Sequence, residues 1–288
     1  MEEKIKEYKN HKKEYSDLKL QYIRNKNAIK DQKRNELIDL KDQYKIDKLR
    51  IEKPLKAEKY EIKVQKKRIH RAKNEPPRRA LLEEIGNAVS HGLGAIAAIV
   101  CLILMILKAS DGLSLAAAII YGTCFFLQML FSCLYHSFRA GSTVKRVFRR
   151  FDYSSIYLQI GGTFAPIYLI YMVNDMWGLA WGISLFAIQW ALIITGITFV
   201  GVFGPGRLRW LHFTLYFAIG WSGLMFIPTW ISKDPQLFFW ILGGGLTYTL
   251  GMIPFAALRK KPVAHFIWHL VCLLGAILQW VGIYTFIF

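Results

Sequence analysis

Several residue types are scarce in this chain of 288 residues. Its four cysteines lie inside apolar runs with no CxxC pair, so a disulfide scaffold is not expected. Residues 1–73 contain no glycine and one proline, Pro54, a composition that favours helix. Residues 80–288 hold only six acidic residues, too few for the surface of a secreted soluble enzyme. With 53% of all residues hydrophobic, a chain disordered throughout is also excluded.

Charge and hydrophobicity are separated along the chain. Residues 1–79 carry 26 Lys and Arg and 14 Asp and Glu, whereas residues 80–288 carry 12 and 6. The mean hydropathy of the whole chain is nevertheless +0.25. We therefore predict two domains that meet near Pro76 and Pro77: a basic cytoplasmic arm over 1–79 and a membrane domain over 80–288.

The composition of the arm predicts helix. An apolar stripe at a spacing of 3.5 to 3.6 residues favours an amphipathic or coiled-coil arm: Ile5, Tyr8, Tyr15, Tyr22 and Ile29. Lys12, Lys19 and Lys26 take the alternate positions and weaken the stripe, and Pro54 should kink or end the helix. The arm is expected either to bind anionic inner-leaflet lipid or a cytoplasmic protein, or to be a solvated extension. The N-terminus lacks the apolar run of a signal peptide.

Seven apolar runs follow, each long enough to cross a bilayer as a helix. The expected spans are 85–107, 113–138, 151–172, 176–201, 210–230, 236–258 and 264–288. The predicted fold is therefore an all-α seven-transmembrane helix bundle.

The basic residues between the spans predict the direction of the bundle. Ten lie in alternate turns: Arg139, Lys145, Arg146, Arg149, Arg150, Arg207, Arg209, Arg259, Lys260 and Lys261. Lys108 and Lys233 are the two in the remaining turns. Because basic residues stay in the cytoplasm, we predict a multi-pass protein of the cell membrane with a cytoplasmic N-terminus and an extracytoplasmic C-terminus. This bias and the arm account for the net charge of +18, so no nucleic-acid partner is expected.

Five polar residues fall at one predicted depth, just inside the cytoplasmic interface. Ser132 and His136 are one helical turn apart near the end of the second span, and His265 and His269 are one turn apart at the start of the seventh. Asp152 lies at the start of the third span. Ionisable groups at membrane depth are costly, so each is expected to have a partner or a function.

Three neutral imidazoles around one point suit Zn²⁺, which leaves its fourth position to water in catalytic sites. His136, His265 and His269 are the predicted ligands, and Asp152 is the predicted base for a zinc-bound water. Ser132 is placed to hydrogen-bond an oxyanion or Asp152. Alternatively, Asp152 is itself a ligand, in a site that would also suit iron.

These residues and their surroundings resemble the bacterial hemolysin III family. The resemblance covers about residues 80–288 and rests on four segments: 84–94 (EIGNAVSHGLG), 132–136 (SCLYH), 151–166 and 265–269 (HFIWH). The family belongs to the progestin and adiponectin receptor superfamily, which is related to alkaline ceramidases. It implies an intramembrane zinc site made by Ser132, His136, Asp152, His265 and His269. It also implies a role in membrane lipid homeostasis, and its name implies pore formation.

Three functions remain open. The first is a zinc-dependent hydrolase, similar to a ceramidase, which attacks the amide or ester carbonyl of a membrane lipid. The second is a receptor or sensor of membrane state, in which zinc is structural. The third, a pore-forming hemolysin, has little support because the spans lack a wide polar stripe, and a retinal protein is excluded because the seventh span has no lysine.

The remaining histidines of the spans receive simpler interpretations. His91, one turn after Asn87, is expected to pack or to support the site without binding metal. His212, beside Trp210, is expected to be an interfacial anchor. Gly161 and Gly162, and the run Gly243 to Gly245, are expected to allow close approach of helices.

Overall fold

A computed structural model describes residues 25, 29, 32–50, 53–258, 261 and 263–288, apart from the side chain of residue 256. The chain divides into two compact units, Met1–Lys73 and Asn74–Phe288. Within the described residues every regular element is a helix. The expected all-α fold is confirmed.

In the first unit, two helices pair as a hairpin. Residues 32–50 are helical, Lys53 is not, and helix α2 (Pro54–Asn74) begins at Pro54, so the first helix ends before this proline as expected. Ile46, Ala57 and Val64 are buried, and an ion pair of 2.6 Å joins Arg50 to Glu61. Of the predicted stripe, Ile29 is exposed, and Ile5, Tyr8, Tyr15 and Tyr22 lie outside the described residues. Pairing of the arm with a second chain therefore stays a prediction.

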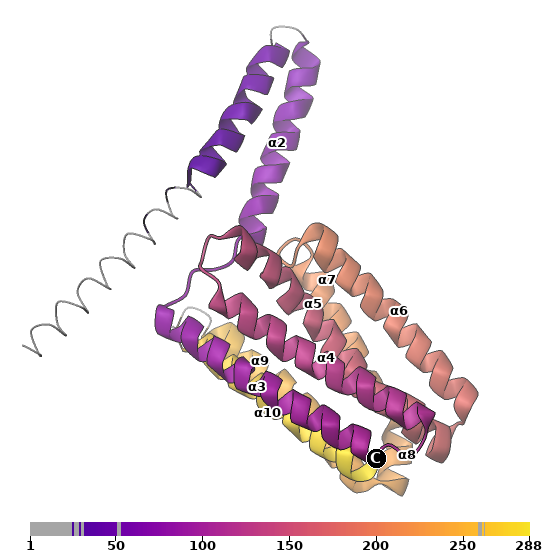
Figure 1. Ribbon diagram of the computed structural model, residues 1–288. Coiled ribbons are helices and arrows are strands. Elements are labelled where there is room, and N and C mark those ends of the chain that lie inside the picture. Colours follow the sequence, from indigo (N-terminus) through magenta and orange to yellow (C-terminus); the bar gives the residue numbers. More distant parts are fainter. Residues whose placement is uncertain (1–24, 26–28, 30–31, 51–52, 259–260, 262) are drawn as a thin grey trace, which may run out of the picture. The chain divides into compact units, whose positions relative to one another are not determined.

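The second unit contains the membrane domain. Seven of its helical segments are long and apolar enough to span a bilayer: Leu81–Lys108, Gly112–Ser137, Thr143–Met176, Leu179–Phe203, Arg209–Lys233, Pro235–Phe255 and Ala264–Phe286. The first two are α3 (Leu81–Lys108) and α4 (Gly112–Ser137), and the fourth and seventh are α6 (Leu179–Phe203) and α10 (Ala264–Phe286). The chain ends at the opposite end of the bundle from the start of α3 (Figure 1). The seven predicted spans are confirmed.

The third span begins earlier than expected. Helix α5 (Thr143–Pro166) starts eight residues before Phe151, because the Ser142 side chain caps it by accepting the backbone N–H of Lys145 at 3.1 Å. The basic segment that the sequence suggested as a turn is therefore mostly helical. The span continues after Pro166 as a π-helix, η1 (Ile167–Met176).

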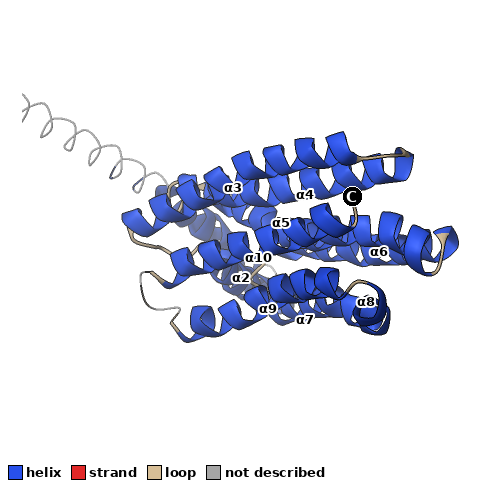
Figure 2. Cartoon of the chain, turned by 90° about the horizontal axis from the view of Figure 1, so that it is seen from below, coloured by secondary structure: helices blue, strands red, loops and turns tan. Residues whose placement is uncertain are grey.

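This third span is the centre of the bundle and the most buried of the seven. Helix α4 packs on α3 and on α5, while α10 packs on α3 and on α9 (Pro235–Ala257). Helix α5 also contacts α6 and α10, as the view from below shows (Figure 2). The end of α5 that carries Asp152 is thus brought near α4 and α10, the helices with the histidines.

Close helix approach depends on small residues, as the sequence suggested. A Cβ built on Gly162 would lie 2.6 Å from the Cβ of Cys124 in α4, closer than side-chain carbons approach. A Cβ on Gly244 would lie 2.8 Å from the carbonyl oxygen of Gly275 in α10. The fifth span is broken into α7 (Arg209–Gly220), a 3₁₀ turn η2 (Trp221–Phe226) and α8 (Ile227–Lys233).

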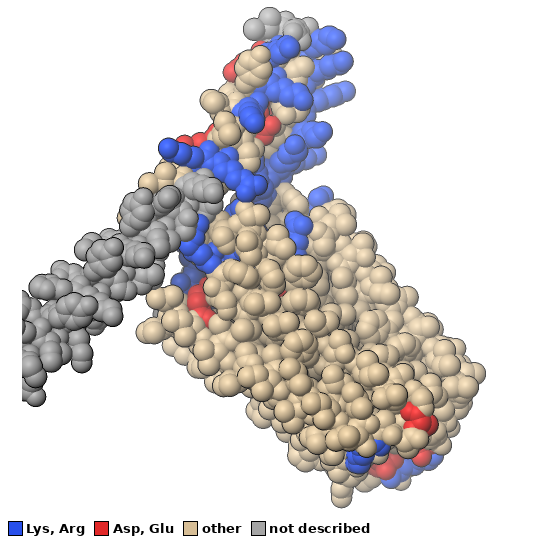
Figure 3. All heavy atoms as spheres, in the orientation of Figure 1, with Lys and Arg blue, Asp and Glu red and all other residues tan. Residues whose placement is uncertain are grey.

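Charge is confined to the ends of the membrane domain. On the face shown in Figure 3, the flank of this unit between its two ends carries no acidic or basic atoms. Its apolar side chains include many exposed ones, such as Leu93, Ile96 and Ile194. Such a band, unfavourable in water, matches the hydrocarbon core of a bilayer.

Candidate metal centre

Three histidine side chains from two helices converge at one end of the bundle. His136 lies in the last turn of α4, and His265 and His269 lie in the first turns of α10. Nε2 of His265 is 3.3 Å from Nε2 of His136 and 3.2 Å from Nε2 of His269. One nitrogen from each ring therefore faces a common point, as predicted.

The spacing of these nitrogens fits a metal. Zn–N bonds of about 2.0–2.1 Å at tetrahedral angles place two ligand nitrogens roughly 3.3 Å apart. The three ligand atoms lie within 4.8 Å of one another, and His136 and His269 are each 3% exposed. This buried cluster can bind a metal ion.

Asp152 and Ser132 lie beside the cluster. Ser132 is buried on α4, and its side chain lies close to the Asp152 carboxyl on α5. The same carboxyl interacts electrostatically with the His136 ring. Asp152 does not belong to the group of three possible ligands found in the described chain. Asp152 is thus near the cluster.

Sequence reasoning missed a second carboxylate, Glu84 of α3. Its Oε2 atom lies 2.6 Å from Nδ1 of His136, on the side of the ring away from the other histidines. Asn87 Nδ2 lies 3.3 Å from the same nitrogen. The sequence did contain a signal for Glu84: positions 84, 87 and 91 are polar and lie on one face of a largely apolar span.

A buried lysine completes this arrangement. The side chain of Lys145 is fully buried, and its Nζ lies 3.0 Å from Oε1 of Glu84. The sequence grouped Lys145 with the basic turn residues, an assignment that its burial in α5 corrects. A lysine of this kind cannot be distinguished from its basic neighbours by spacing alone.

The other two histidines of the membrane domain, His91 and His212, do not join the cluster. Nε2 of His91 lies 3.2 Å from the carbonyl oxygen of His269, and the centroids of the two imidazole rings are 3.9 Å apart. His91 therefore packs behind the site, as expected. The expectation for His212 was wrong: it is 2% exposed, and its Nδ1 is 2.9 Å from the Tyr157 hydroxyl. The buried tyrosine of α5 gives this imidazole a partner inside the bundle.

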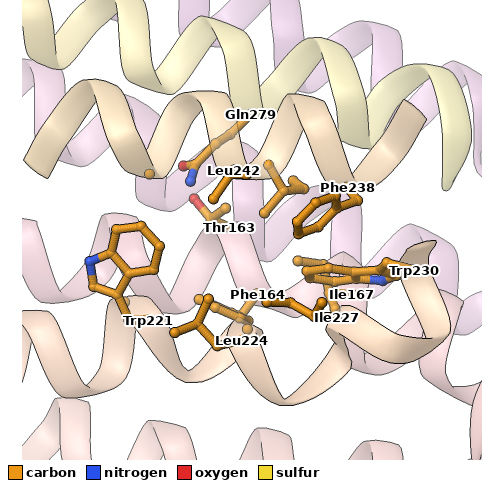
Figure 4. Close-up of a pocket in the computed structure, with 14 residues that line it drawn as sticks. Thr163, Phe164, Ile167, Trp221, Leu224, Ile227, Trp230, Phe238, Leu242 and Gln279 are labelled. Atoms are coloured by element: carbon orange, nitrogen blue, oxygen red, sulfur yellow. The ribbon is translucent and has the colours of Figure 1, made fainter. Parts of the chain in front are cut away.

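An apolar pocket lies elsewhere in the bundle, between α5, η2, α9 and α10. Its wall includes Phe164, Trp221 and Trp230, with Thr163 and Gln279 as its polar side chains (Figure 4). None of the five predicted site residues lines it. Its lining suits hydrocarbon more than a charged group.

Comparison with known proteins assigns the chain to a family. The family model described as haemolysin-III related matches residues 79–280. The chain belongs to the hemolysin III family. It is 37% identical to Hemolysin-3 of Bacillus cereus over 198 residues, and this aligned segment covers 67% of this chain and 87% of that protein. It is 31% identical over 198 residues to the Hemolysin-3 homolog of Bacillus subtilis (strain 168), covering 67% and 89%. The N-terminal arm lies outside the segment that matches the hemolysin III family.

Proposed function

We propose that this protein is a zinc-dependent hydrolase that cleaves an amide or ester bond of a membrane lipid near the cytoplasmic face. The observation that carries the proposal is the spacing of 3.2 and 3.3 Å between the histidine Nε2 atoms. Imidazole nitrogens in a tetrahedral arrangement favour Zn²⁺ over Mg²⁺ or Ca²⁺, which prefer oxygen ligands. His136, His265 and His269 would hold the metal.

A bound Zn²⁺ supplies two functions at such a site: it polarises a carbonyl and makes water more acidic. The chain supplies the proton acceptor. Asp152, placed by α5 beside the cluster, accepts a proton from the attacking water and later returns it to the leaving amine or alcohol. Ser132 holds the Asp152 carboxyl through its hydroxyl, or donates to the oxyanion that develops at the carbonyl.

A lipid substrate is supported by the surroundings of the site. The flank of the membrane domain is apolar, so a bilayer lipid can reach it without crossing water. Thr163 is 11 residues after Asp152 on α5, which places the apolar pocket about 16 Å further along this helix. A hydrocarbon chain that extends from the cluster would meet this apolar lining, in agreement with a role in lipid homeostasis.

The proposal includes the direction of the chain and the partners of its arm. The N-terminus and the cluster lie on the cytoplasmic side and the C-terminus lies outside, because the basic turns favour this topology. The basic arm binds anionic inner-leaflet lipid or a cytoplasmic protein. Of the basic residues in the last inner turn, 259 and 260 lie outside the described residues.

One experiment separates the hydrolase from a sensor with structural zinc. Purified protein is analysed for metal and placed in liposomes that contain candidate lipid amides and esters. Wild type should contain zinc and release fatty acid. Asp152→Asn should contain zinc but release no fatty acid. Zinc-loaded wild type that cleaves none of these lipids would favour the sensor, and protein without metal would reject both.

A further inference from the structure

The ring of His136 is held from behind by a carboxylate. Its Nδ1 atom faces Oε2 of Glu84 at 2.6 Å, while its Nε2 atom faces His265 at 3.3 Å. A carboxylate can only accept a hydrogen bond, so this contact places the proton of the neutral ring on Nδ1. The lone pair of Nε2 is then directed into the cluster, as a metal ligand requires.

A second contact at Nδ1 favours the other tautomer. The amide nitrogen of Asn87, a donor, also lies 3.3 Å from Nδ1 of His136. Without the carboxylate, the amide would donate to Nδ1 and favour the tautomer with its proton on Nε2. That proton would point at the other histidines and prevent His136 from binding a metal.

Lys145 in turn fixes Glu84. Its ammonium group has three contacts inside the protein. Nζ lies 3.0 Å from Oε1 of Glu84 and donates to the carbonyl oxygen of Phe138 at 2.9 Å. It also lies 4.8 Å from the centroid of the Tyr135 ring. A charge in a dry site is costly unless it is paired, and here each charge compensates the other. The orientation of the carboxylate therefore depends on this lysine.

We propose that Glu84 and Lys145 form a positioning pair that sets the tautomer and direction of His136. The pair lies in α3 and α5 and acts on α4, so it connects three spans at the end of the bundle that holds the cluster. This inference rests on the proposed metal site, because a directed Nε2 lone pair has its use in binding a metal.

Substitutions at the two positions should have effects that depend on each other. In Glu84→Gln, Lys145 attracts the amide oxygen and turns the amide nitrogen toward Nδ1 of His136, where it acts as a donor. Adding Lys145→Met frees the amide to rotate, so that its oxygen can again accept from Nδ1. Lys145→Met should therefore weaken the site in the native background and improve it in the Glu84→Gln background.

The test measures Zn²⁺ affinity of the full chain in detergent by competition with a chelator. Glu84→Gln should lower the affinity about 10- to 100-fold, the usual effect of losing a partner behind a ligand. The double variant should bind more tightly than Glu84→Gln alone. Lys108→Met is the matched control, because Lys108 also donates to a carbonyl oxygen and lies over a ring, both of Tyr284, away from the cluster. The Zn²⁺ affinity of Lys108→Met should equal that of wild type.

Wild-type affinity in Glu84→Gln, or an equal effect of Lys145→Met in both backgrounds, would overturn the pair. Nitrogen NMR of the imidazoles in metal-free protein gives a second readout that needs no bound metal. His136 should carry its proton on Nδ1 in wild type and on Nε2 in Glu84→Gln, and an unchanged tautomer would also overturn the inference. Wild type without measurable Zn²⁺ affinity would instead reject the proposed function, and the NMR result would still decide the role of the pair.

Discussion

Nε2 of His265 lies 3.3 Å from Nε2 of His136, although 129 positions separate the two residues in the chain. This contact joins the last turn of α4 to the first turn of α10. A metal held there would connect two spans that are far apart in sequence, so metal binding and stability should be coupled.

Removal of two ligands should remove the metal. We expect His265→Ala/His269→Ala to retain less than about a tenth of the wild-type zinc, since one imidazole cannot hold the ion. Wild type should also lose thermal stability when a strong chelator is added, because zinc binds the folded state. Elemental analysis and melting curves measure the two effects.

The control for this experiment is His212→Ala, which removes a buried histidine bonded to Tyr157, outside the cluster. It should keep its zinc and its sensitivity to chelator. Full zinc occupancy in the double variant would show that the three histidines are not the site.

Asp152→Asn should separate catalysis from metal binding. As the proposed base, Asp152 can be replaced without loss of a ligand, so zinc should remain while lipid hydrolysis falls by a factor on the order of 10² or more. Release of fatty acid from liposomes measures the rate. If zinc is lost together with activity, Asp152 is a ligand, and a wild-type rate with zinc bound would remove it from the mechanism.

The C-terminus should be accessible from outside the cell. The four native cysteines are replaced, and one cysteine is added after Phe288. An impermeant thiol reagent should label it in intact cells, because basic turns favour the cytoplasm. Ala140→Cys, in the turn between α4 and α5, is the control and should be labelled only after lysis. The reverse pattern would place the metal centre at the other leaflet.

The turn before α4 should give a small dependence of stability on pH. The Asp111 carboxylate accepts the backbone N–H of Ser114 at 2.8 Å, and this hydrogen bond holds the pKa of Asp111 below its usual value. A lowered folded-state pKa stabilises the protein above the unfolded pKa of about 3.9, and the effect is lost as the pH falls further. Asp111→Ala should therefore melt below wild type at pH 6, with a difference that shrinks toward about pH 3.

Asp111→Asn provides the control for this pH effect, because its amide oxygen still caps the helix without a titrating group. Its difference from Asp111→Ala should stay constant over the same range. If the difference in melting temperature between wild type and Asp111→Ala does not change with pH, the charge of the carboxylate has no role in stability.

Parts of the site were readable from the sequence because they follow from local rules. Ser132 with His136, and His265 with His269, are each four residues apart, so each pair shares a helix face. The expectation failed where a partner came from another span. His212 looked like an interfacial residue because the chain shows Trp210 next to it and does not show Tyr157 across the bundle.

The sequence by itself determined the seven spans, the separation of a basic arm from a membrane domain, and the three histidines of the cluster. Hydrophobic length and helical period are properties of contiguous residues, so they can be read along the chain. Only the tertiary structure decided that α5 is central and that Glu84 and Lys145 lie behind His136. The contacts of Glu84 with its partners cross 52 positions or more, and such contacts form only when the helices pack.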